Sequence, residues 1–275
     1  MHPIAEKYIR KSALPTIFCP GCGHGTVLNA FLRAVDSLDI FDSLGLVSGI
    51  GCSSWTPVFI NTDVMHTLHG RALAFATGLK IANADLDVVA FSGDGDCVGI
   101  GGNHLIHAAR RNIDMTILML DNAIYGMTGG QVSPTTPTDA KSQTTPYGNP
   151  EPQFDACALV TSAGATHVAR YTTAQPRALV KGIKAAITHK GFSFLHIISQ
   201  CPTQAGRYIF ELTQPAEYLQ MIRDHSISIA AAAKCAKNDL QNKIITGILY
   251  ECDDRPEFVD KLTRIKRNRL HENQA

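Results

Sequence analysis

Residues 86–96 read LDVVAFSGDGD, an apolar run that ends in a glycine–aspartate loop. The run from Leu86 to Ser92 is nearly continuous in apolar side chains, as expected of a parallel strand that is covered on both faces. Similar runs recur along the chain, at 44–50, 114–120, 166–170 and 192–199. Helical patterns fall between these runs, at about 24–38, 71–84, 100–112 and 174–189. This alternation predicts an α/β fold with a doubly wound, mainly parallel sheet.

The loop Gly93-Asp94-Gly95-Asp96 leaves the predicted strand and opens a helix, at the end of the sheet where such folds bind ligands. Glycine lets backbone N–H groups approach phosphate oxygens, and Mg²⁺ is held by one or two carboxylates together with phosphate. Asp94 can supply the carboxylate, Asn122 an amide oxygen and Ile124 a backbone carbonyl. A strand-to-helix turn without a ligand is the alternative, but Asn122, one βαβ step later, favours a site for Mg²⁺ and a diphosphate.

A long polar segment begins directly after this second site. Residues 126–153 are rich in Gly, Pro, Thr and Ser, and a loop of this length inside a compact domain is more often functional than idle. We expect it to lie over the cofactor. The chain is expected to form a main binding domain at 1–200 and a C-terminal extension at 201–275. In the extension we expect a lightly structured connection with a short helix at 202–225 and a basic helix or frayed tail at 255–275.

Four of the eight cysteines stand in loops where their sulfur atoms can meet. Cys19 and Cys22 form a C-x-x-C pair around a Pro-Gly turn, Cys52 follows a predicted strand, and Cys201 follows another. Four thiolates suit either zinc or a [4Fe–4S] cluster. Structural zinc sites usually use two short pairs, so one pair together with two distant single cysteines favours the cluster.

The other four cysteines have different contexts. Cys157, Cys235 and Cys252 stand in apolar or helical surroundings and are interpreted as buried small hydrophobic residues. Cys97 follows the acidic loop and is expected to line the pocket or to belong to the core.

Charge and hydropathy exclude several classes of partner. With 275 residues and a formal net charge of +1, the chain gives no reason to expect nucleic acid or an acidic membrane surface as a partner. No apolar run reaches the roughly 18–20 residues that are needed to span a bilayer. The N-terminal residues lack the apolar core of an export signal. We therefore expect a cytoplasmic protein.

Taken together, these motifs resemble the β subunits of 2-oxoacid:ferredoxin oxidoreductases, over nearly the whole chain. The motifs that carry the resemblance are Cys19-Pro20-Gly21-Cys22-Gly23-His24, Gly51-Cys52-Ser53-Ser54, His69-Gly70-Arg71-Ala72, Gly93-Asp94-Gly95-Asp96, Gly101-Gly102-Asn103-His104 and Asp121-Asn122-Ala123-Ile124-Tyr125-Gly126-Met127-Thr128-Gly129-Gly130-Gln131. The resemblance implies a thiamine-diphosphate-binding domain of the diphosphate type with a short C-terminal extension.

The resemblance also assigns residues to cofactors. It implies that one [4Fe–4S] cluster is ligated by Cys19, Cys22, Cys52 and Cys201. It implies that Mg²⁺ is bound by Asp94, Asn122 and the carbonyl of Ile124. The expected contacts to thiamine diphosphate are Gly93, Asp94, Gly95, Asp96, Asn122, Ile124, Gly126, Met127 and Thr128. His69 and Arg71 are the expected catalytic residues, with a helix cap or a surface position as the alternative for each.

The reaction that the resemblance implies is the oxidative decarboxylation of a 2-oxoacid with coenzyme A, with electrons passing through the cluster to ferredoxin. Residues 127–137 resemble the branch that converts 2-oxoglutarate to succinyl-CoA, and pyruvate or an aryl-pyruvate is the alternative substrate. Some relatives carry a basic residue shortly after the Cys52-Ser53 pair, whereas this chain has Ser54-Trp55-Thr56. A dicarboxylic substrate would then need Arg71 or a residue of a partner subunit to pair its distal carboxylate.

A partner subunit is expected because the chain carries only the diphosphate half of a thiamine site. By resemblance, an α subunit supplies the pyrimidine-type domain and the glutamate that activates thiamine, so the chain is expected to be active only with that subunit. Two other interpretations are a lobe of a non-redox thiamine enzyme with structural zinc, and a non-catalytic zinc-binding scaffold. Bound iron would exclude the first, and binding of thiamine diphosphate would exclude the second.

Overall fold

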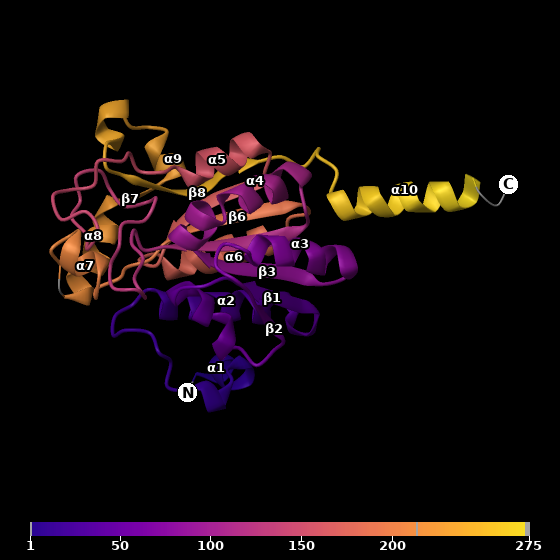
Figure 1. Cartoon of the computed structure of the whole chain (residues 1–275), viewed down its shortest axis with the longest axis horizontal. Coiled ribbons are helices and arrows are strands. Elements are labelled where there is room, and N and C mark those ends of the chain that lie inside the picture. The colour runs from indigo at the N-terminus through magenta and orange to yellow at the C-terminus, as the bar shows by residue number, and fades with distance from the viewer. Residues whose placement is uncertain (1, 213, 273–275) are drawn as a thin grey trace.

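The computed structural model describes residues 2–212 and 214–272. The strands in that part of the chain are β1 Leu44–Ser48, β2 Val64–His66, β3 Asp87–Gly93, β4 Met115–Asp121, β5 His167–Thr172, β6 Phe192–Ile198, β7 Ser226–Ser228 and β8 Ile244–Glu251. They form one sheet in the order β2-β1-β3-β4-β6-β5-β8-β7, with helices on both faces (Figure 1). Neighbouring strands pair in parallel except β5 and β8, which pair antiparallel. The predicted doubly wound, mainly parallel sheet is confirmed.

The longer helices divide between the two faces of the sheet. α2 (His24–Leu38) and α6 (Pro176–Thr188) share one hydrophobic cluster, and α1 (Pro3–Tyr8) packs on α2. α3 (Ala72–Ala82), α4 (Gly102–Arg111) and α5 (Ala156–Ala163) share the cluster on the opposite face. The four expected helices are present, whereas α5 is short and was not expected.

Strand β3 shows why the deciding stretch is apolar without interruption. Val89 and Phe91 belong to the cluster under α2, where the rings of Phe31 and Phe91 lie 5.1 Å apart edge to face. Val88 and Ala90 belong to the cluster under α3 and α4. Since successive side chains of a strand point to opposite faces, a strand covered on both faces needs an apolar residue at every position.

Residues 202–225 differ from the expectation. They contain two helices, α7 (Ala205–Tyr208) and α8 (Pro215–His225), and Tyr218 and Ile222 of α8 are buried. The interpretation of this segment as a lightly structured connection with one short helix is therefore wrong. The strands β2, β7 and β8 were also not expected. The division at residue 200 stays a prediction, although the sheet continues across it because β8 pairs with β5.

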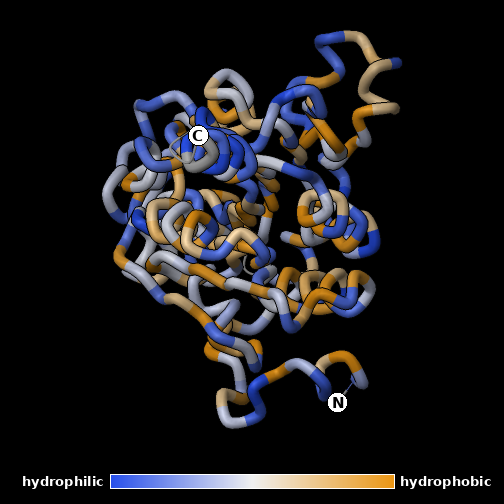
Figure 2. Tube along the Cα trace, turned by 90° about the vertical axis from the view of Figure 1, so that its right-hand side faces the viewer, coloured by the Kyte–Doolittle hydropathy of each residue, from blue (hydrophilic) through white to orange (hydrophobic). Residues whose placement is uncertain are grey.

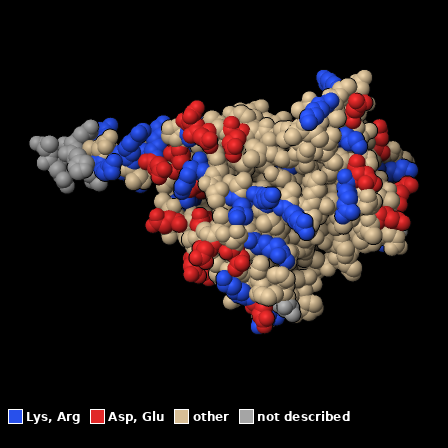
Figure 3. Space-filling model, turned by 180° about the vertical axis from the view of Figure 1, so that it is seen from behind, with Lys and Arg blue, Asp and Glu red and all other residues tan. Residues whose placement is uncertain are grey.

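The last described helix is α10 (Phe258–Glu272), a basic helix that projects from the body (Figure 1). Residues 273–275 of the predicted basic tail lie outside the described residues. Figure 2 colours this helix mostly hydrophilic, and Figure 3 shows lysine and arginine side chains gathered along it. The remaining short elements are α9 Ile229–Ala232, the 3-10 turns at Lys11–Ala13, Phe41–Ser43, Cys52–Trp55, Pro57–Phe59 and Lys237–Leu240, and a π-helical turn at Gly95–Ile100. Over the described ranges, no helix combines the length and apolar character that crossing a membrane requires.

Candidate cofactor site and four-cysteine cavity

A pocket lies at the carboxyl ends of β1, β3 and β4. Its walls include all nine predicted cofactor-binding residues and the predicted catalytic His69, which are Gly93, Asp94, Gly95, Asp96, Asn122, Ile124, Gly126, Met127, Thr128 and His69. His24, Ser53 and Tyr125 also line it and were not expected. Arg71 is not part of this wall, since it is exposed and its Nη1 lies 2.6 Å from Nε2 of His104. A catalytic role for either His69 or Arg71 stays a prediction.

Asp94 is buried in this pocket beside a second acid. The residue is 3% exposed, and the single hydroxyl of Thr135 lies 2.6 Å from Oδ2 of Asp94 and 2.8 Å from Oδ1 of Asp121. One hydroxyl proton cannot satisfy both oxygens. Burial raises the pKa of Asp94 above its ordinary value, and the nearby charge of Asp121 raises it further. Among the residues that the structure describes, no lysine, arginine or histidine forms an ion pair with Asp94, so its charge suits a cation from outside the chain.

Asp96 has a different surrounding from Asp94. Its carboxylate accepts hydrogen bonds from Gly70 N at 2.7 Å, Ile50 N at 3.1 Å and Ser92 Oγ at 2.5 Å, and lies 2.6 Å from Nδ1 of His69. Asp96 therefore joins the loops after β1 and β2 to the acidic loop and orients His69. Gly49 leaves room for this carboxylate, because a Cβ at that position would lie 2.1 Å from Oδ2 of Asp96.

The chain turns sharply at Ala123, between two predicted magnesium ligands. Ala123 has φ 61°, in the left-handed region that L residues other than Asn and Asp rarely adopt. Its N–H donates to Oδ1 of Asp121 at 2.9 Å, and its carbonyl accepts from the Thr136 hydroxyl at 2.6 Å. This turn leaves Asn122, which is 7% exposed, and Ile124 in the same pocket wall as Asp94.

Behind the pocket lies a buried polar chain that sequence reasoning missed. Nε2 of His196 lies 2.7 Å from Oδ2 of Asp121, and Nδ1 of His196 accepts from Nε of Arg170 at 3.1 Å. Because Nδ1 accepts, the ring proton sits on Nε2 and is donated to Asp121. The pattern of β6 gives no sign of this role, because Ser193 and His196 are isolated polar positions in a mostly apolar strand.

The four predicted cluster cysteines line one neighbouring cavity of about 310 Å³. Cys19 and Cys22 come from the turn before α2, Cys52 opens the turn after β1, and Cys201 follows β6. A Cβ placed on Gly126 would lie 3.6 Å from the sulfur of Cys52 and 3.7 Å from that of Cys201. Four cysteines separated by up to 182 positions in the sequence thus face one space.

Burial raises the pKa of the Cys22 thiol to about 12 and that of Cys52 to about 11, and neighbouring thiols of the group add to both shifts. Burial also raises the pKa of Cys201. Such thiols keep their protons near neutral pH unless a metal replaces them. Four sulfur donors in the wall of one cavity are the observation that fits a bound metal centre.

The other cysteines bear out the interpretation only in part. Cys97 and Cys157 are buried and belong to a hydrophobic cluster, as expected of small core residues. Cys235 is exposed and Cys252 is partly exposed, so their interpretation as buried residues is wrong. Both stand in the C-terminal region, where the apolar pattern belongs to edge elements that are covered on one side only.

Comparison with known proteins defines the class first. The family model described as the C-terminal TPP binding domain of thiamine pyrophosphate enzymes matches residues 49–197, which contain the acidic loop and Asn122. The fold and the pocket are therefore those of a thiamine-diphosphate-binding domain.

Relatives that match over nearly the full length of the chain then identify the family within this class. The 2-oxoglutarate synthase subunit KorB of Methanocaldococcus jannaschii is 49% identical, with 96% of this chain and 97% of the relative covered. The subunit of the same name from Methanothermobacter thermautotrophicus is 50% identical over 93% of this chain and 89% of the relative. A solved structure of 2-oxoglutarate:ferredoxin oxidoreductase from Magnetococcus marinus is 39% identical, with a TM-score of 0.85 and coverage of 97% of this chain and 90% of that one.

The chain belongs to the β subunits of the 2-oxoacid:ferredoxin oxidoreductases, and within them to the 2-oxoglutarate type. It is thus a subunit of a thiamine-dependent oxidoreductase, which confirms the family and the enzyme class predicted from the sequence. The interpretation as a non-catalytic scaffold is excluded.

Proposed function

We propose that this chain carries the diphosphate half of the thiamine site and the electron outlet of an enzyme that converts 2-oxoglutarate and coenzyme A to succinyl-CoA and carbon dioxide. One observation carries the proposal: the cofactor pocket and the four-cysteine cavity share Cys52, Asn122, Gly126 and Met127 in their walls. A redox centre in the second space would lie against a cofactor in the first, as electron transfer between them requires.

In the pocket, Asp94, Asn122 and the carbonyl of Ile124 would hold Mg²⁺, and Gly93 and Gly95 would let backbone groups approach the diphosphate. When bound, thiamine diphosphate supplies the electron sink that lets a 2-oxoacid lose carbon dioxide. The chain's own part is to position the cofactor and to exclude water from it. The pocket encloses only about 90 Å³, which suits a diphosphate and supports the need for an α subunit that completes the site with a pyrimidine-type domain and a glutamate.

In the cavity, Cys19, Cys22, Cys52 and Cys201 would ligate a [4Fe–4S] cluster. The distances between their sulfur atoms argue against zinc. Four thiolates at about 2.3 Å from a tetrahedral zinc lie about 3.8 Å from one another. Within the described part of the chain, the four cysteines do not supply three sulfur atoms that all lie within 4.8 Å of one another. A cubane cluster needs wider sulfur spacing and fits the cavity of about 310 Å³.

The substrate and the partners follow from the relatives. The full-length relatives are named for 2-oxoglutarate, and the solved structure is described with 2-oxoglutarate, coenzyme A and succinyl-CoA bound. Other relatives carry the broader name 2-oxoacid:ferredoxin oxidoreductase, as in Aeropyrum pernix at 37% identity, so pyruvate remains the competing substrate. Ferredoxin is the proposed electron acceptor. Because Arg71 is exposed outside the pocket of this chain, a residue of the α subunit is the better candidate to pair the distal carboxylate.

The test is the metal content of the chain purified with its α subunit in the absence of oxygen. We expect about four irons and four acid-labile sulfides per chain, and a paramagnetic signal after reduction. Cys201→Ala should lose the signal and coenzyme A-dependent acceptor reduction, whereas the matched control Cys235→Ala, at an exposed cysteine outside the cavity, should keep both. Zinc without iron or sulfide would overturn the electron-transfer role.

A second measurement tests the substrate on the same preparation. Rates of ferredoxin reduction with coenzyme A are compared for 2-oxoglutarate, pyruvate and an aryl-pyruvate. A higher kcat/KM for 2-oxoglutarate supports the proposal, and a higher value for either of the others would replace the substrate while leaving the metal chemistry in place.

A further inference from the structure

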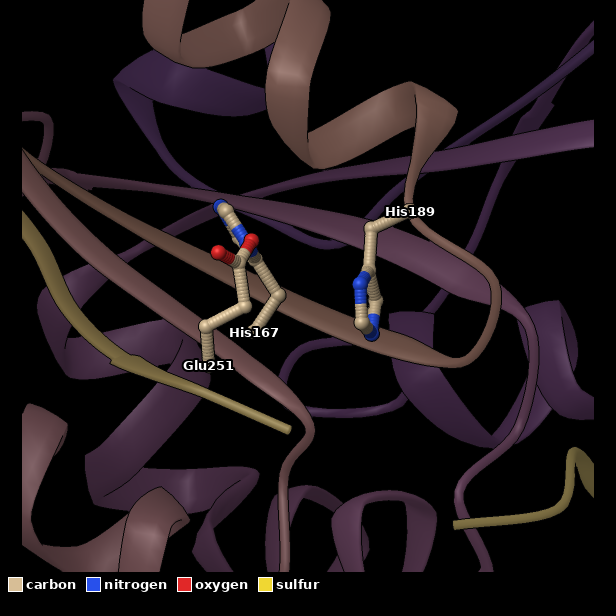
Figure 4. A group of neighbouring side chains, drawn as sticks. All are labelled: His167, His189 and Glu251. Atoms are coloured by element: carbon tan, nitrogen blue, oxygen red, sulfur yellow. The ribbon is translucent and has the colours of Figure 1, made fainter. Parts of the chain in front are cut away.

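A second group of metal-ligating side chains lies at the opposite end of the sheet from the thiamine site. His167 opens β5, His189 follows α6, and Glu251 ends β8 (Figure 4). Among the described residues, these three bring one donor atom each within 4.8 Å of the other two. We propose that they form a site for a divalent transition metal, with Zn²⁺ as the best-suited ion, which fastens β8 to β5.

The sheet register brings the first two donors together. β8 runs antiparallel to β5, and Glu251 is the direct partner of His167 in that pairing. Oε1 of Glu251 lies 2.9 Å from Nδ1 of His167, and Figure 4 shows the carboxylate against that edge of the ring. The ring of His189 lies beside them, with its centroid 5.4 Å from that of His167.

Hydrogen bonds fix which nitrogen of His189 is free. Oδ1 of Asn112 accepts from Phe192 N at 2.8 Å, so it is an acceptor, and the Thr166 hydroxyl donates to it at 2.7 Å. With its proton committed, the Thr166 oxygen accepts from Nε2 of His189 at 2.8 Å. The proton of the neutral ring therefore sits on Nε2, and Nδ1 carries the lone pair.

The lone pair on Nδ1 of His189 lies near one further carboxylate. Nδ1 of His189 lies 3.8 Å from Oδ1 of Asp253, which is beyond hydrogen-bonding distance. An imidazole whose second nitrogen donates to an ordered oxygen is the arrangement that metal-bound histidines adopt.

The two histidines of the site are buried, whereas its acidic side is open to solvent. The side chains of His167 and His189 are 0% and 6% exposed, whereas those of Glu251 and Asp253 are 47% and 85% exposed. Nε2 of His167 is buried and has no hydrogen-bond partner, so the contact of Nδ1 with the carboxylate of Glu251 is the polar contact that positions this ring. Two imidazoles and a carboxylate with room for water or Asp253 match the ligand set that zinc prefers.

The experiment uses the αβ complex with its iron content measured before and after, so that zinc entering the cysteine cavity is recognised by loss of iron. ZnSO₄ is titrated by calorimetry after treatment with a chelator. Wild type is expected to bind one Zn²⁺ per chain beyond the iron. Glu251→Gln keeps an acceptor for His167 but removes the charge, and His189→Gln keeps a donor for Thr166 but removes Nδ1. Each is expected to weaken binding about 100-fold or more, and Thr166→Val about 10-fold.

Asp254→Asn is the matched control, since it removes an exposed carboxylate three positions beyond Glu251 that is not part of the donor set. It is expected to leave the affinity unchanged. Zn²⁺ should also slow amide hydrogen exchange in residues 244–251 of wild type and not of Glu251→Gln. Should His189→Gln fail to fold, the half-exposed Glu251→Gln still decides the matter. Absence of stoichiometric binding in wild type, or equal binding by Glu251→Gln, would overturn the site.

Discussion

Asp94 and Asp114 are two largely buried acids at opposite ends of the same sheet. Asp94 follows β3 at its carboxyl end, and Asp114 precedes β4 at its amino end. Asp114 is paired within the chain, because Nζ of Lys80 lies 2.9 Å from Oδ2, Nζ of Lys190 lies 3.3 Å from it, and Gly191 N donates to Oδ1 at 3.2 Å. Asp94 faces Asp121 and Thr135 instead.

The pKa values of the two acids differ in direction for this reason. Burial alone would raise the pKa of Asp114, but the hydrogen bond and charge of Lys80 hold it below 3.8. Burial raises the pKa of Asp94 and nothing in its described surroundings reverses the shift. A buried acid that the fold has paired is a structural element, whereas one left without a cation marks a place where function supplies one.

The largest expected effect follows from removing the acid at the cofactor end. Asp94→Asn should lower the activity of the αβ complex by about 100-fold or more, because the proposed carboxylate ligand of Mg²⁺ is lost. It should leave the cofactor-free chain as stable as wild type or more stable, because an uncompensated buried charge disappears. Steady-state rates and thermal unfolding without cofactor test both parts, and clear destabilisation of the cofactor-free chain would contradict this interpretation of Asp94.

The second prediction concerns the ion pair of Asp114 with Lys80 at the other end of the sheet. Lys80→Met should lower the free energy of unfolding by about 3 kcal/mol, because it leaves the buried carboxylate of Asp114 with only the exposed Lys190 as partner. The specific activity of the folded enzyme should not change. Denaturant unfolding measures the loss, and Lys7→Met, at an exposed pair with Asp36, is the control that should change stability very little.

The pH dependence of stability sharpens the comparison further. A folded-state pKa below the unfolded value stabilises the fold above the unfolded pKa, and this contribution is lost as the pH falls through the folded value. The stability difference between wild type and Asp114→Asn should therefore be constant from about pH 5 to 7 and shrink below about pH 4. Thermal unfolding of both proteins across that range tests it, and a difference that grows in acid would refute the pairing.

The smallest expected effect concerns the backbone at the two ends. Ala123 and Asn112 both have positive φ, 61° and 54°. Ala123→Gly should raise the free energy of unfolding by about 0.5–1 kcal/mol, because glycine adopts this conformation without strain. Asn112→Gly should lower it by about 2 kcal/mol, because the buried amide bonds Phe192 N and the Arg255 carbonyl. Denaturant melts compare the pair, and equal signs would show that strain is not concentrated at the cofactor end.

Much of the architecture was predictable because its causes are local. Continuous apolar runs such as Val88 to Phe91 and the glycines around Asp94 belong to short segments whose hydropathy and flexibility can be read directly. The strand ends of a parallel sheet then place Asp94 and Asn122 at the same edge. The members of the four-cysteine set were predictable, since loop positions and family resemblance select Cys19, Cys22, Cys52 and Cys201, and these four line one cavity.

The tertiary structure alone decided the features that depend on pairs distant in the chain. Three features have no local signal in the sequence: the hydrogen bond between Asp121 and His196, the burial of Tyr218 in α8, and the contact of His167 with Glu251 across the antiparallel pair β5–β8. The sequence determined by itself a doubly wound sheet with an acidic loop and four loop cysteines, since short-range hydropathy and turn chemistry suffice for these. The tertiary structure alone decided which acids are paired within the chain and which have no cationic partner, because burial and distance set the electrostatic cost of each group.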